Sequence, residues 1–91
     1  MIFEWDESKS LANHKNHGIS FDEASSIFSD PLSITVADPD HSEAEFRFID
    51  VGMSVQRRLL VVSYTERGRS IRIISARRAL PVERRCYEKN D

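Results

Sequence analysis

Residues 59–78 read LLVVSYTERGRSIRIISARR, and this stretch decides the fold. Its first part, Leu59–Thr65, is the most β-prone run of the chain because leucine, valine and tyrosine dominate it. The next four residues, Glu66–Arg69, include a glycine and are typical of a turn between two strands. Ser70–Ala76 then carries three isoleucines. The stretch therefore predicts a β-hairpin with strands over Leu59–Thr65 and Ser70–Ala76.

Two runs upstream predict further strands. Leu32–Val36 and Glu45–Val51 alternate apolar with polar side chains, as strands with one buried face do. Short turns follow them at Asp38–Asp40 and Gly52–Ser54. Because strands joined by short turns pair antiparallel, we expect four consecutive strands in one antiparallel meander.

The start of the chain combines a short strand with a polar helix. Ile2–Trp5 is a strand candidate, and Asp6 is a suitable N-cap for a helix over Glu7–His17. Gly18 is expected to end that helix in a left-handed conformation. Since the helix has almost no apolar residues, we expect it to lie on the surface, anchored by Leu11.

Two further helices are expected. Ser20 and Glu23 have the spacing of a capping box, which opens a helix that reaches about Phe28. Pro81 suits the first turn of a last helix that runs to about Asn90. Three side chains of that helix are expected to face inward: Val82, Cys86 and Tyr87. The predicted fold class is α+β, with the first two helices on one face of the sheet and the other face open.

The composition is that of one small globular domain. The chain has 91 residues, 40% of them hydrophobic and 31% charged, and we expect a single domain over residues 1–91. The single cysteine, Cys86, excludes an intramolecular disulfide and fits a reducing compartment. No run is long enough to span a membrane, and the first residues do not resemble a signal peptide. These features predict a cytoplasmic protein without a membrane partner.

The net charge of −2 hides a strong asymmetry. Three bases and eleven acids precede Arg57, whereas ten bases, nine of them arginine, and four acids follow from Arg57 onward. The first part therefore has a formal charge of −8 and the second +6. Such a distribution predicts a local anion-binding surface, or two halves that neutralise each other within one fold.

Several chemistries have no support in the sequence. With three glycines in all, the chain has no glycine-rich phosphate loop. His14 and His17 are spaced to share a helix face, but one further histidine and a lone cysteine complete a poor zinc ligand set. We expect no metal and no cofactor.

The remaining candidates for a functional site are the arginines, and Arg72 needs an explanation first because it lies within an apolar strand. A guanidinium in an apolar strand requires water, a carboxylate or an anionic ligand. Glu66 or Glu83 is a possible ion-pair partner, and an RNA phosphate is the alternative. Strict alternation places Arg72 on the open face together with Ile74, opposite the core.

Segments at both ends of the chain resemble one toxin family. The resemblance rests on Phe3-Glu4-Trp5-Asp6, Lys9, Asn13, His17-Gly18, Ile19-Ser20-Phe21-Asp22-Glu23-Ala24, Ile71–Ala79, Glu83-Arg84-Arg85 and Tyr87, at these spacings. Together they resemble the BrnT-type toxins. The chain departs from the family pattern at Asn16, where a basic residue is usual, and at Leu80–Val82, where a more polar stretch is usual. We expect the first departure to weaken RNA contact near His17 and the second to alter the entry of the last helix.

The resemblance implies a RelE-like fold and a ribonuclease that blocks translation. It also implies neutralisation by an antitoxin with a ribbon-helix-helix DNA-binding domain, and contact with DNA only through the toxin–antitoxin complex.

On this basis we hypothesise a metal-independent endoribonuclease. Arg72 and Arg77 would stabilise the transition state, and Glu83, Tyr87 or His17 would transfer protons. The RNA-binding set would be Arg57, Arg58 and Arg78. Two alternatives remain at this point: a binding module for nucleic acid or protein without catalysis, and a corepressor that acts with its antitoxin.

Overall fold

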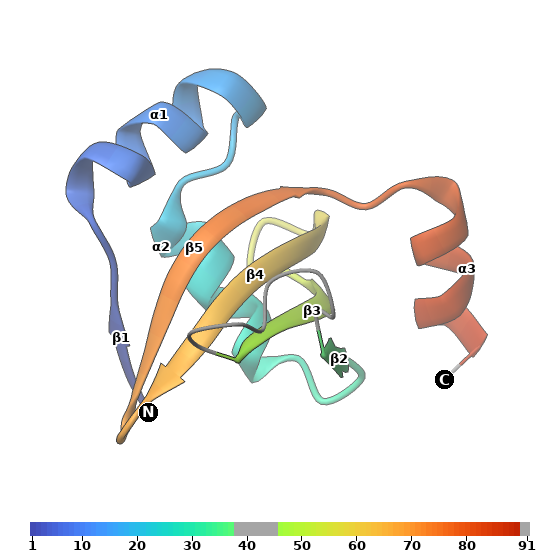
Figure 1. Ribbon diagram of the computed structural model, residues 1–91. Coiled ribbons are helices and arrows are strands. Elements are labelled where there is room, and N and C mark those ends of the chain that lie inside the picture. Colours follow the sequence, from blue (N-terminus) through green and yellow to red (C-terminus); the bar gives the residue numbers. More distant parts are fainter. Residues whose placement is uncertain (38–45, 90–91) are drawn as a thin grey trace.

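The computed structural model describes residues 1–37 and 46–89 and contains a five-stranded sheet in the order β1-β5-β4-β3-β2 (Figure 1). The strands are β1 (Ile2–Glu4), β2 (Ile34–Ala37), β3 (Arg47–Met53), β4 (Leu59–Arg67) and β5 (Ser70–Arg78). The helices are α1 (Glu7–His17), α2 (Phe21–Ser25), the 3-10 helix η1 (Ser26–Ser29) and α3 (Pro81–Lys89). The predicted α+β class is confirmed, and β2 to β5 form the predicted antiparallel meander. The turn expected at Asp38–Asp40 lies outside the described residues.

The first strand makes the sheet mixed. β1 pairs parallel with β5, with Phe3 opposite Ile71 and Glu4 opposite Arg72. The sequence predicted this strand but not its partner, since a pairing across nearly seventy residues leaves no local signal. Parallel strands need a long connection, and here the chain runs through α1, α2 and the remaining strands before β5 begins (Figure 1).

The main core lies between the sheet and the first two helices. Its fully enclosed side chains are Ile19, Phe21, Ala24 and Ile27 from the helical layer, and Leu60, Val62, Ile73 and Ala76 from the sheet. Phe28 adds an aromatic cluster, with its ring 5.3 Å from that of Phe3 and 4.9 Å from that of Tyr64. Burial of a side chain as large as Phe21 stabilises the fold by about 1.5–3 kcal/mol.

The C-terminal helix covers part of the opposite face of the sheet. Tyr87 is buried there against Val51, Leu59 and Val61. The prediction that Val82 and Cys86 face inward was wrong, because Val82 is 54% exposed and Cys86 is also exposed. The prediction that Tyr87 faces inward is confirmed, and Glu83, one turn earlier on the same face of α3, is partly buried.

The polar helix α1 is held by hydrogen bonds and not by an apolar anchor. Leu11, the expected anchor, is 66% exposed. The buried side chains of α1 are Ser10 and Asn13. The Ser10 hydroxyl accepts from the Phe21 N–H at 3.3 Å, and Asn13 bonds to Ile19 and Ala76. The helix packs against the edge of a strand, where backbone groups need partners, so its inner side chains are polar.

A β-bulge in β5 determines which way its arginines point. The β4–β5 register pairs Ile73 with Tyr64 and Ser75 with Ser63, so Ile74 is an extra residue in β5. Without this bulge, Arg77 would share the core face with Ile73. With it, Ala76 enters the core and Arg77 turns to the opposite face, in register with Val61. Arg72 lies between Ile71 and Ile73, which pack on the core side, so it lies on the opposite face as predicted, and the regular alternation ends at Ile74.

In the part of the chain that the structure describes, no helix has the length and apolar character needed to cross a membrane.

Candidate functional site

Four segments meet at one end of the sheet. The last turn of α1 lies beside the β3–β4 turn, because an Arg58 Nη2–H donates to the Gly18 carbonyl at 3.1 Å. The end of β5 lies beside the start of β4, since the Ala79 N–H donates to the Leu59 carbonyl at 3.0 Å. The first turn of α3 completes the group through its contact with β5 (Figure 1). We call this region the basic end, and its members are His17, Arg57, Arg77, Arg78 and Glu83.

Arg77 and Glu83 form a bidentate ion pair at the basic end. The two terminal nitrogens of Arg77 donate to the two carboxylate oxygens at 2.8 and 2.7 Å, and the side chains are 42% and 24% exposed. The Leu80 N–H donates to Glu83 Oε1 at 2.8 Å, which fixes the carboxylate at the start of α3. The hydrogen bonds from Arg77 outweigh desolvation and hold the pKa of Glu83 below its usual range.

The Arg77 guanidinium retains donors for a ligand. One Nη1–H donates to Glu83 and the other to the Arg78 carbonyl at 3.3 Å, whereas Nη2 has one bond to Glu83. A guanidinium has five N–H donors, so Nε–H and one Nη2–H have no partner in the described part of the chain. The pair thus combines an ionised carboxylate with an oriented, partly unsatisfied cation.

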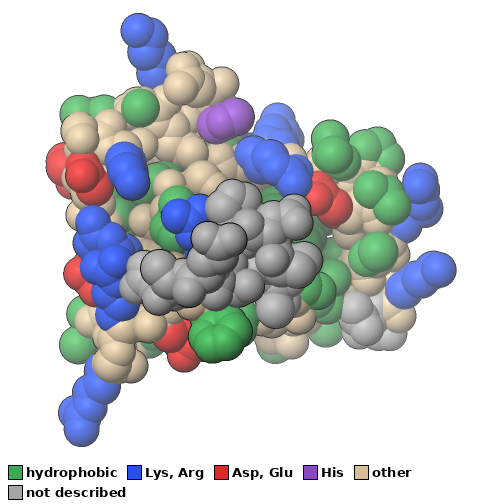
Figure 2. All heavy atoms as spheres, in the orientation of Figure 1, with side chains coloured by type: hydrophobic (Ala, Val, Ile, Leu, Met, Phe, Trp, Pro, Cys, Tyr) green, Lys and Arg blue, Asp and Glu red, His purple; other side chains and the backbone are tan. Residues whose placement is uncertain are grey.

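Arg78 extends the cationic surface to the other side of the sheet. It is in register with Leu60, whose side chain lies in the core on the helical face. Its exposed guanidinium has no hydrogen bond or ion pair among the described residues. Figure 2 shows basic side chains gathered between α1 and α3, next to a histidine and an acidic side chain, and a second basic group at the left of the view.

His17 lies at the C-terminal end of α1 and is exposed. It follows Asn13 by one helical turn on the same face, and Asn13 bonds to Ala76 immediately before Arg77. The left-handed Gly18 (φ 72°) ends the helix at this point, as the sequence predicted. The histidine therefore projects from the edge of the same basic end.

Arg58 has a different position from its neighbour Arg57. Its guanidinium bonds to both oxygens of Glu23, which is 3% exposed, with Nε–H donating at 2.9 Å. The Ser54 hydroxyl donates to the same carboxylate at 2.7 Å. The Arg58 hydrogen bond outweighs desolvation and lowers the pKa of Glu23. Arg58 thus joins α2 to the β3–β4 turn, whereas the exposed Arg57 side chain has no partner among the described residues.

Tyr87 is on the inner face of α3. Its ring lies in the core, and its hydroxyl donates to Asp30 Oδ2 at 2.6 Å. Asp30 also accepts from the backbone N–H groups of Leu32 and Met53. Desolvation opposes ionisation of Asp30, but these three bonds outweigh it and the pKa is lowered. Tyr87 therefore anchors α3 to the segment after η1.

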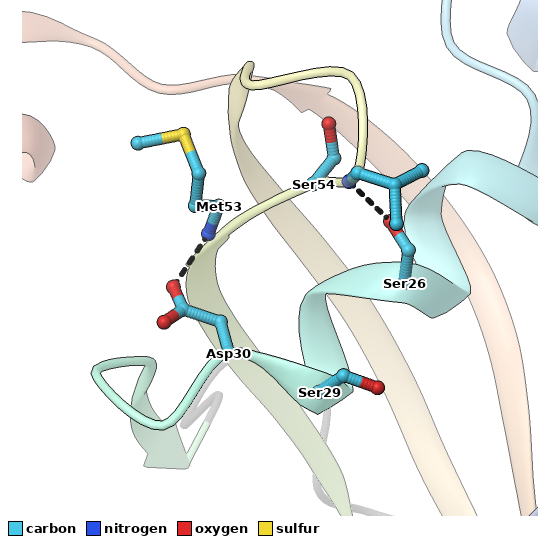
Figure 3. Close-up of a pocket in the computed structure, with 6 residues that line it drawn as sticks. Ser26, Ser29, Asp30, Met53 and Ser54 are labelled. Atoms are coloured by element: carbon cyan, nitrogen blue, oxygen red, sulfur yellow. Dashed lines mark hydrogen bonds between the residues drawn. The ribbon is translucent and has the colours of Figure 1, made fainter.

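A hollow of about 240 Å³ lies beside Asp30. It is lined by Ser26, Ser29, Asp30, Met53, Ser54 and Val55 (Figure 3). Its polar groups have internal partners, because the Met53 N–H donates to Asp30 at 2.8 Å and the Val55 N–H to Ser26 at 3.0 Å (Figure 3). It contains no pairing of acid and base like that of Arg77 with Glu83.

Arg72 lies away from the basic end. It pairs with Glu4 of β1 at 3.4 Å, and both side chains are partly exposed. Five residues of strand separate it from Arg77, which corresponds to roughly 15 Å. Arg77 and Glu83 are in direct contact, whereas Arg78, Arg57 and His17 lie at the same end of the sheet with no side-chain hydrogen bond or ion pair to that pair among the described residues, and Arg72 lies at a distance. Among the described residues, no three histidine, cysteine, aspartate or glutamate side chains could hold a metal ion together.

Residues 5–83 match the family described as "Ribonuclease toxin, BrnT, of type II toxin-antitoxin system". The chain belongs to the BrnT family. The resemblance found in the sequence is thereby confirmed, as is membership in a family of ribonuclease toxins. No curated protein sequence matches the chain.

The BrnT fold is also found in a solved structure. The 1.1 Å crystal structure of the Brucella abortus ribonuclease toxin BrnT is similar to this chain with a TM-score of 0.63. The match covers 88% of this chain and 99% of the other, at 23% sequence identity. At that identity the likeness supports the fold and leaves the site to be argued from this chain's own residues.

Two residues that shape this BrnT site were not among the sequence candidates. Glu23 was explained as a helix-capping acid, and its pairing with Arg58 spans 35 residues without a local signal. Asn13 entered only as part of the family pattern. Its position one turn before His17, on a helix face with Ser10, is a signal that was available.

Proposed function

We propose that this BrnT-family chain is a metal-independent endoribonuclease whose reaction takes place at Arg77 and Glu83. The observation that carries the proposal is the partly exposed bidentate pair, in which an ionised carboxylate and a guanidinium with unsatisfied donors lie side by side. A phosphate needs a cation with donors, and a ribose hydroxyl needs a base. The pair offers both at one point of the surface.

In the proposed reaction, Glu83 accepts the proton of the ribose 2′-hydroxyl, and O2′ attacks the adjacent phosphorus. The bond from phosphorus to O5′ breaks, and protonated His17 supplies the proton for the leaving oxygen. The products are a 2′,3′-cyclic phosphate and a 5′-hydroxyl end. Arg77 donates to the phosphate oxygens, where negative charge develops in the transition state.

The ion pair also offers a way to activate the base. While Arg77 bonds to Glu83, the pKa of the carboxylate is low and its affinity for a proton is weak. When a phosphate takes hydrogen bonds from Arg77, Glu83 loses part of its stabilising partner, so its pKa rises towards the usual range. Substrate binding would thereby convert an ion-paired acid into a better base.

The other candidate residues have supporting roles in this proposal. Arg78 and the more distant Arg72 would bind the RNA backbone by charge. Arg58 would support the site through Glu23, and Tyr87 would hold α3 so that Glu83 stays opposite Arg77.

We also propose neutralisation by an antitoxin with a ribbon-helix-helix DNA-binding domain. The antitoxin would cover the basic end, and the complex would bind DNA through the antitoxin alone and repress its own operon. Support comes from the type II toxin–antitoxin description of the family and from the cationic surface, which suits an acidic partner segment.

The test is RNA cleavage by the purified chain in EDTA, with analysis of the product ends. We expect cleavage to continue in EDTA, with cyclic phosphate and 5′-hydroxyl ends, and Arg77→Ala to reduce turnover about 10²–10³-fold. Arg85→Ala, on the exposed part of α3, is the charge-matched control. Cleavage that stops in EDTA and returns with a divalent cation would refute metal independence.

A further inference from the structure

The tip of the β3–β4 turn carries an arginine in a conformation that favours glycine. Arg57 has φ 63°, and it is the described non-glycine residue with a positive φ. Its N–H donates to the Ser54 carbonyl at 2.9 Å, and the Ser54 N–H donates to the Arg58 carbonyl at 2.9 Å. This is a tight turn followed by a left-handed residue, a position where glycine or asparagine avoids the clash of Cβ with the backbone.

The β4–β5 hairpin has a glycine at the corresponding left-handed position of its turn. The β4–β5 turn has its left-handed residue at Gly68, with φ 58°. A Cβ built on Gly68 would meet no atom within 4 Å, so glycine serves the backbone conformation there and nothing else. Arg57 occupies the equivalent backbone conformation with a long cationic side chain.

Surrounding contacts hold the β3–β4 turn firmly in this shape. The Ser54 hydroxyl accepts from the N–H groups of Gln56 at 3.2 Å and Arg58 at 3.3 Å. The Ser26 hydroxyl accepts from the Val55 N–H at 3.0 Å, and Arg58 ties the end of the turn to Glu23. A strained residue persists where neighbouring structure fixes it, and such residues gather at binding sites.

The Arg57 side chain is also available. It is exposed and has no hydrogen bond or ion pair within the described residues, whereas Arg58, Arg72 and Arg77 each have a carboxylate partner. The turn lies at the same end of the sheet as Arg77, whose strand partner Val61 follows Arg57 by four residues. Backbone separation between Arg57 and Arg77 is therefore on the order of 10–15 Å.

We propose that Arg57 binds a backbone phosphate of a nucleotide flanking the cleaved one, so that the substrate is an extended single strand. The inference rests on the proposed ribonuclease function. It assigns to the turn a phosphate subsite in which a rigid backbone presents one unpaired guanidinium. A glycine at this position would remove the left-handed backbone strain and so increase stability, but it would also remove the phosphate contact and so lower the affinity for RNA.

The test compares Arg57→Gly with Arg57→Lys and with Arg69→Ala, an exposed charge loss in the turn at the opposite end of the sheet. Binding is measured with 2′-O-methyl oligonucleotides, which lack the attacking hydroxyl, over a range of salt concentrations. One probe is about 12 nucleotides long and the other is a dinucleotide. Thermal unfolding and cleavage of the unmodified dinucleotide complete the set.

For Arg57→Gly we expect a melting temperature about 4 °C above that of the parent, since the left-handed strain is removed. Affinity for the long strand should fall about tenfold, with a salt dependence shallower by about 0.7 in logarithmic slope. The loss in dinucleotide cleavage should be much smaller than the loss in affinity for the long strand. Arg57→Lys should keep the slope, and Arg69→Ala should keep both affinity and slope.

Three results would overturn the inference. Unchanged affinity and slope in Arg57→Gly would mean that the arginine is merely tolerated at the tip. A lower melting temperature would mean that its side chain holds the turn. Equal losses with the dinucleotide and the long strand would place Arg57 in the reaction centre instead of a flanking subsite. A parent that neither binds nor cleaves RNA would instead refute the proposed function, and the subsite with it.

Discussion

Asn13 and Ala76 are joined by two hydrogen bonds that imitate a strand pairing. The Asn13 Nδ2–H donates to the Ala76 carbonyl at 2.9 Å, and the Ala76 N–H donates to Asn13 Oδ1 at 3.1 Å. β1 covers the same edge of β5 only from Ser70 to Arg72. The amide of Asn13 therefore satisfies the backbone of β5 after its partner strand has ended, immediately before Arg77 and Arg78.

Asn13→Ala should lower the free energy of unfolding by about 2–4 kcal/mol, because buried backbone groups of Ile19 and Ala76 lose their partner. Asn13→Asp should be at least as unfavourable, since a carboxylate oxygen would face two carbonyls. Urea unfolding measures both. Asn16→Ala, exposed on the same helix, should stay within about 0.5 kcal/mol of the parent, and a similar loss there would remove the argument.

The strands and helix starts were predictable because their signals are local. Alternation, turn residues and the Asp6 and Ser20 caps all act within a few residues, and the Ser20 hydroxyl does accept from the Glu23 N–H at 3.1 Å. The parallel pairing of β1 with β5 and the bulge at Ile74 depend on packing across the fold. A single inserted residue reverses every later side chain, so strict alternation fails from Ile74 onward and would assign Arg77 to the wrong face of the sheet.

The sequence predicted that the candidate site would be rich in arginine, but it did not predict which arginines and acids lie next to each other. Arginine richness from Arg57 onward was visible in the sequence, but two of the guanidinium groups take their positions from acids far along the chain. Glu4 pairs with Arg72 and Glu23 with Arg58, across 68 and 35 residues. Among the ion pairs of the described residues, the pair of Arg77 with Glu83 is local, at a sequence separation of six.

The ion pair of Glu23 with Arg58 predicts a pH dependence of stability. The folded pKa of Glu23 is lowered, so its stabilisation is present above the unfolded value of about 4.3 and is lost as pH falls through the folded pKa. The difference in unfolding free energy between the parent and Glu23→Gln should therefore shrink in acid. Urea unfolding from neutral to acidic pH measures it, and a constant difference would contradict the lowered pKa.

The neighbouring arginines of the β3–β4 turn should respond in opposite ways. Arg58→Ala leaves the buried Glu23 carboxylate without its cation and should cost about 3 kcal/mol of stability. Arg57→Ala removes an exposed, unpaired side chain and should leave stability within about 0.5 kcal/mol. Thermal unfolding of both variants is sufficient. Equal melting temperatures would show that the ion pair does not hold the turn in solution.

Arg72 and Arg77 should affect different kinetic constants. The exposed pair of Arg72 with Glu4 is worth about 0–1 kcal/mol, so Arg72→Ala should keep a melting temperature near that of the parent. At roughly 15 Å from Arg77, Arg72 should change KM for RNA and leave kcat nearly unchanged. Arg77→Ala should lower kcat. A large fall of kcat in Arg72→Ala would return Arg72 to the catalytic set that the sequence suggested.

Association with the antitoxin should weaken as salt increases, because charge complementarity at the basic end is screened. Affinity measured between low and physiological ionic strength checks this. Hydrogen exchange on the complex should show protection over the β3–β4 turn, the end of β5 and the start of α3. Protection confined to the outer surface of α1 and α2 would contradict direct coverage of the basic end.

Glu83 allows the sharpest distinction between a base and a structural partner of Arg77. Arg77 lowers the pKa of Glu83 in the free protein, and RNA binding should raise it towards the usual range, so the carboxylate is ionised near neutral pH and cleavage should fall only in acid. Glu83→Gln keeps an acceptor for Arg77 and for the Leu80 N–H, so the fold and the position of Arg77 should survive. If Glu83 is the base, kcat should fall about 10²–10⁴-fold and the acidic limb of the pH–rate profile should disappear. If it only orients Arg77, Glu83→Gln should retain most of the activity with the acidic limb unchanged. Single-turnover cleavage of one RNA across acidic and neutral pH, with parent and variant side by side, separates these outcomes.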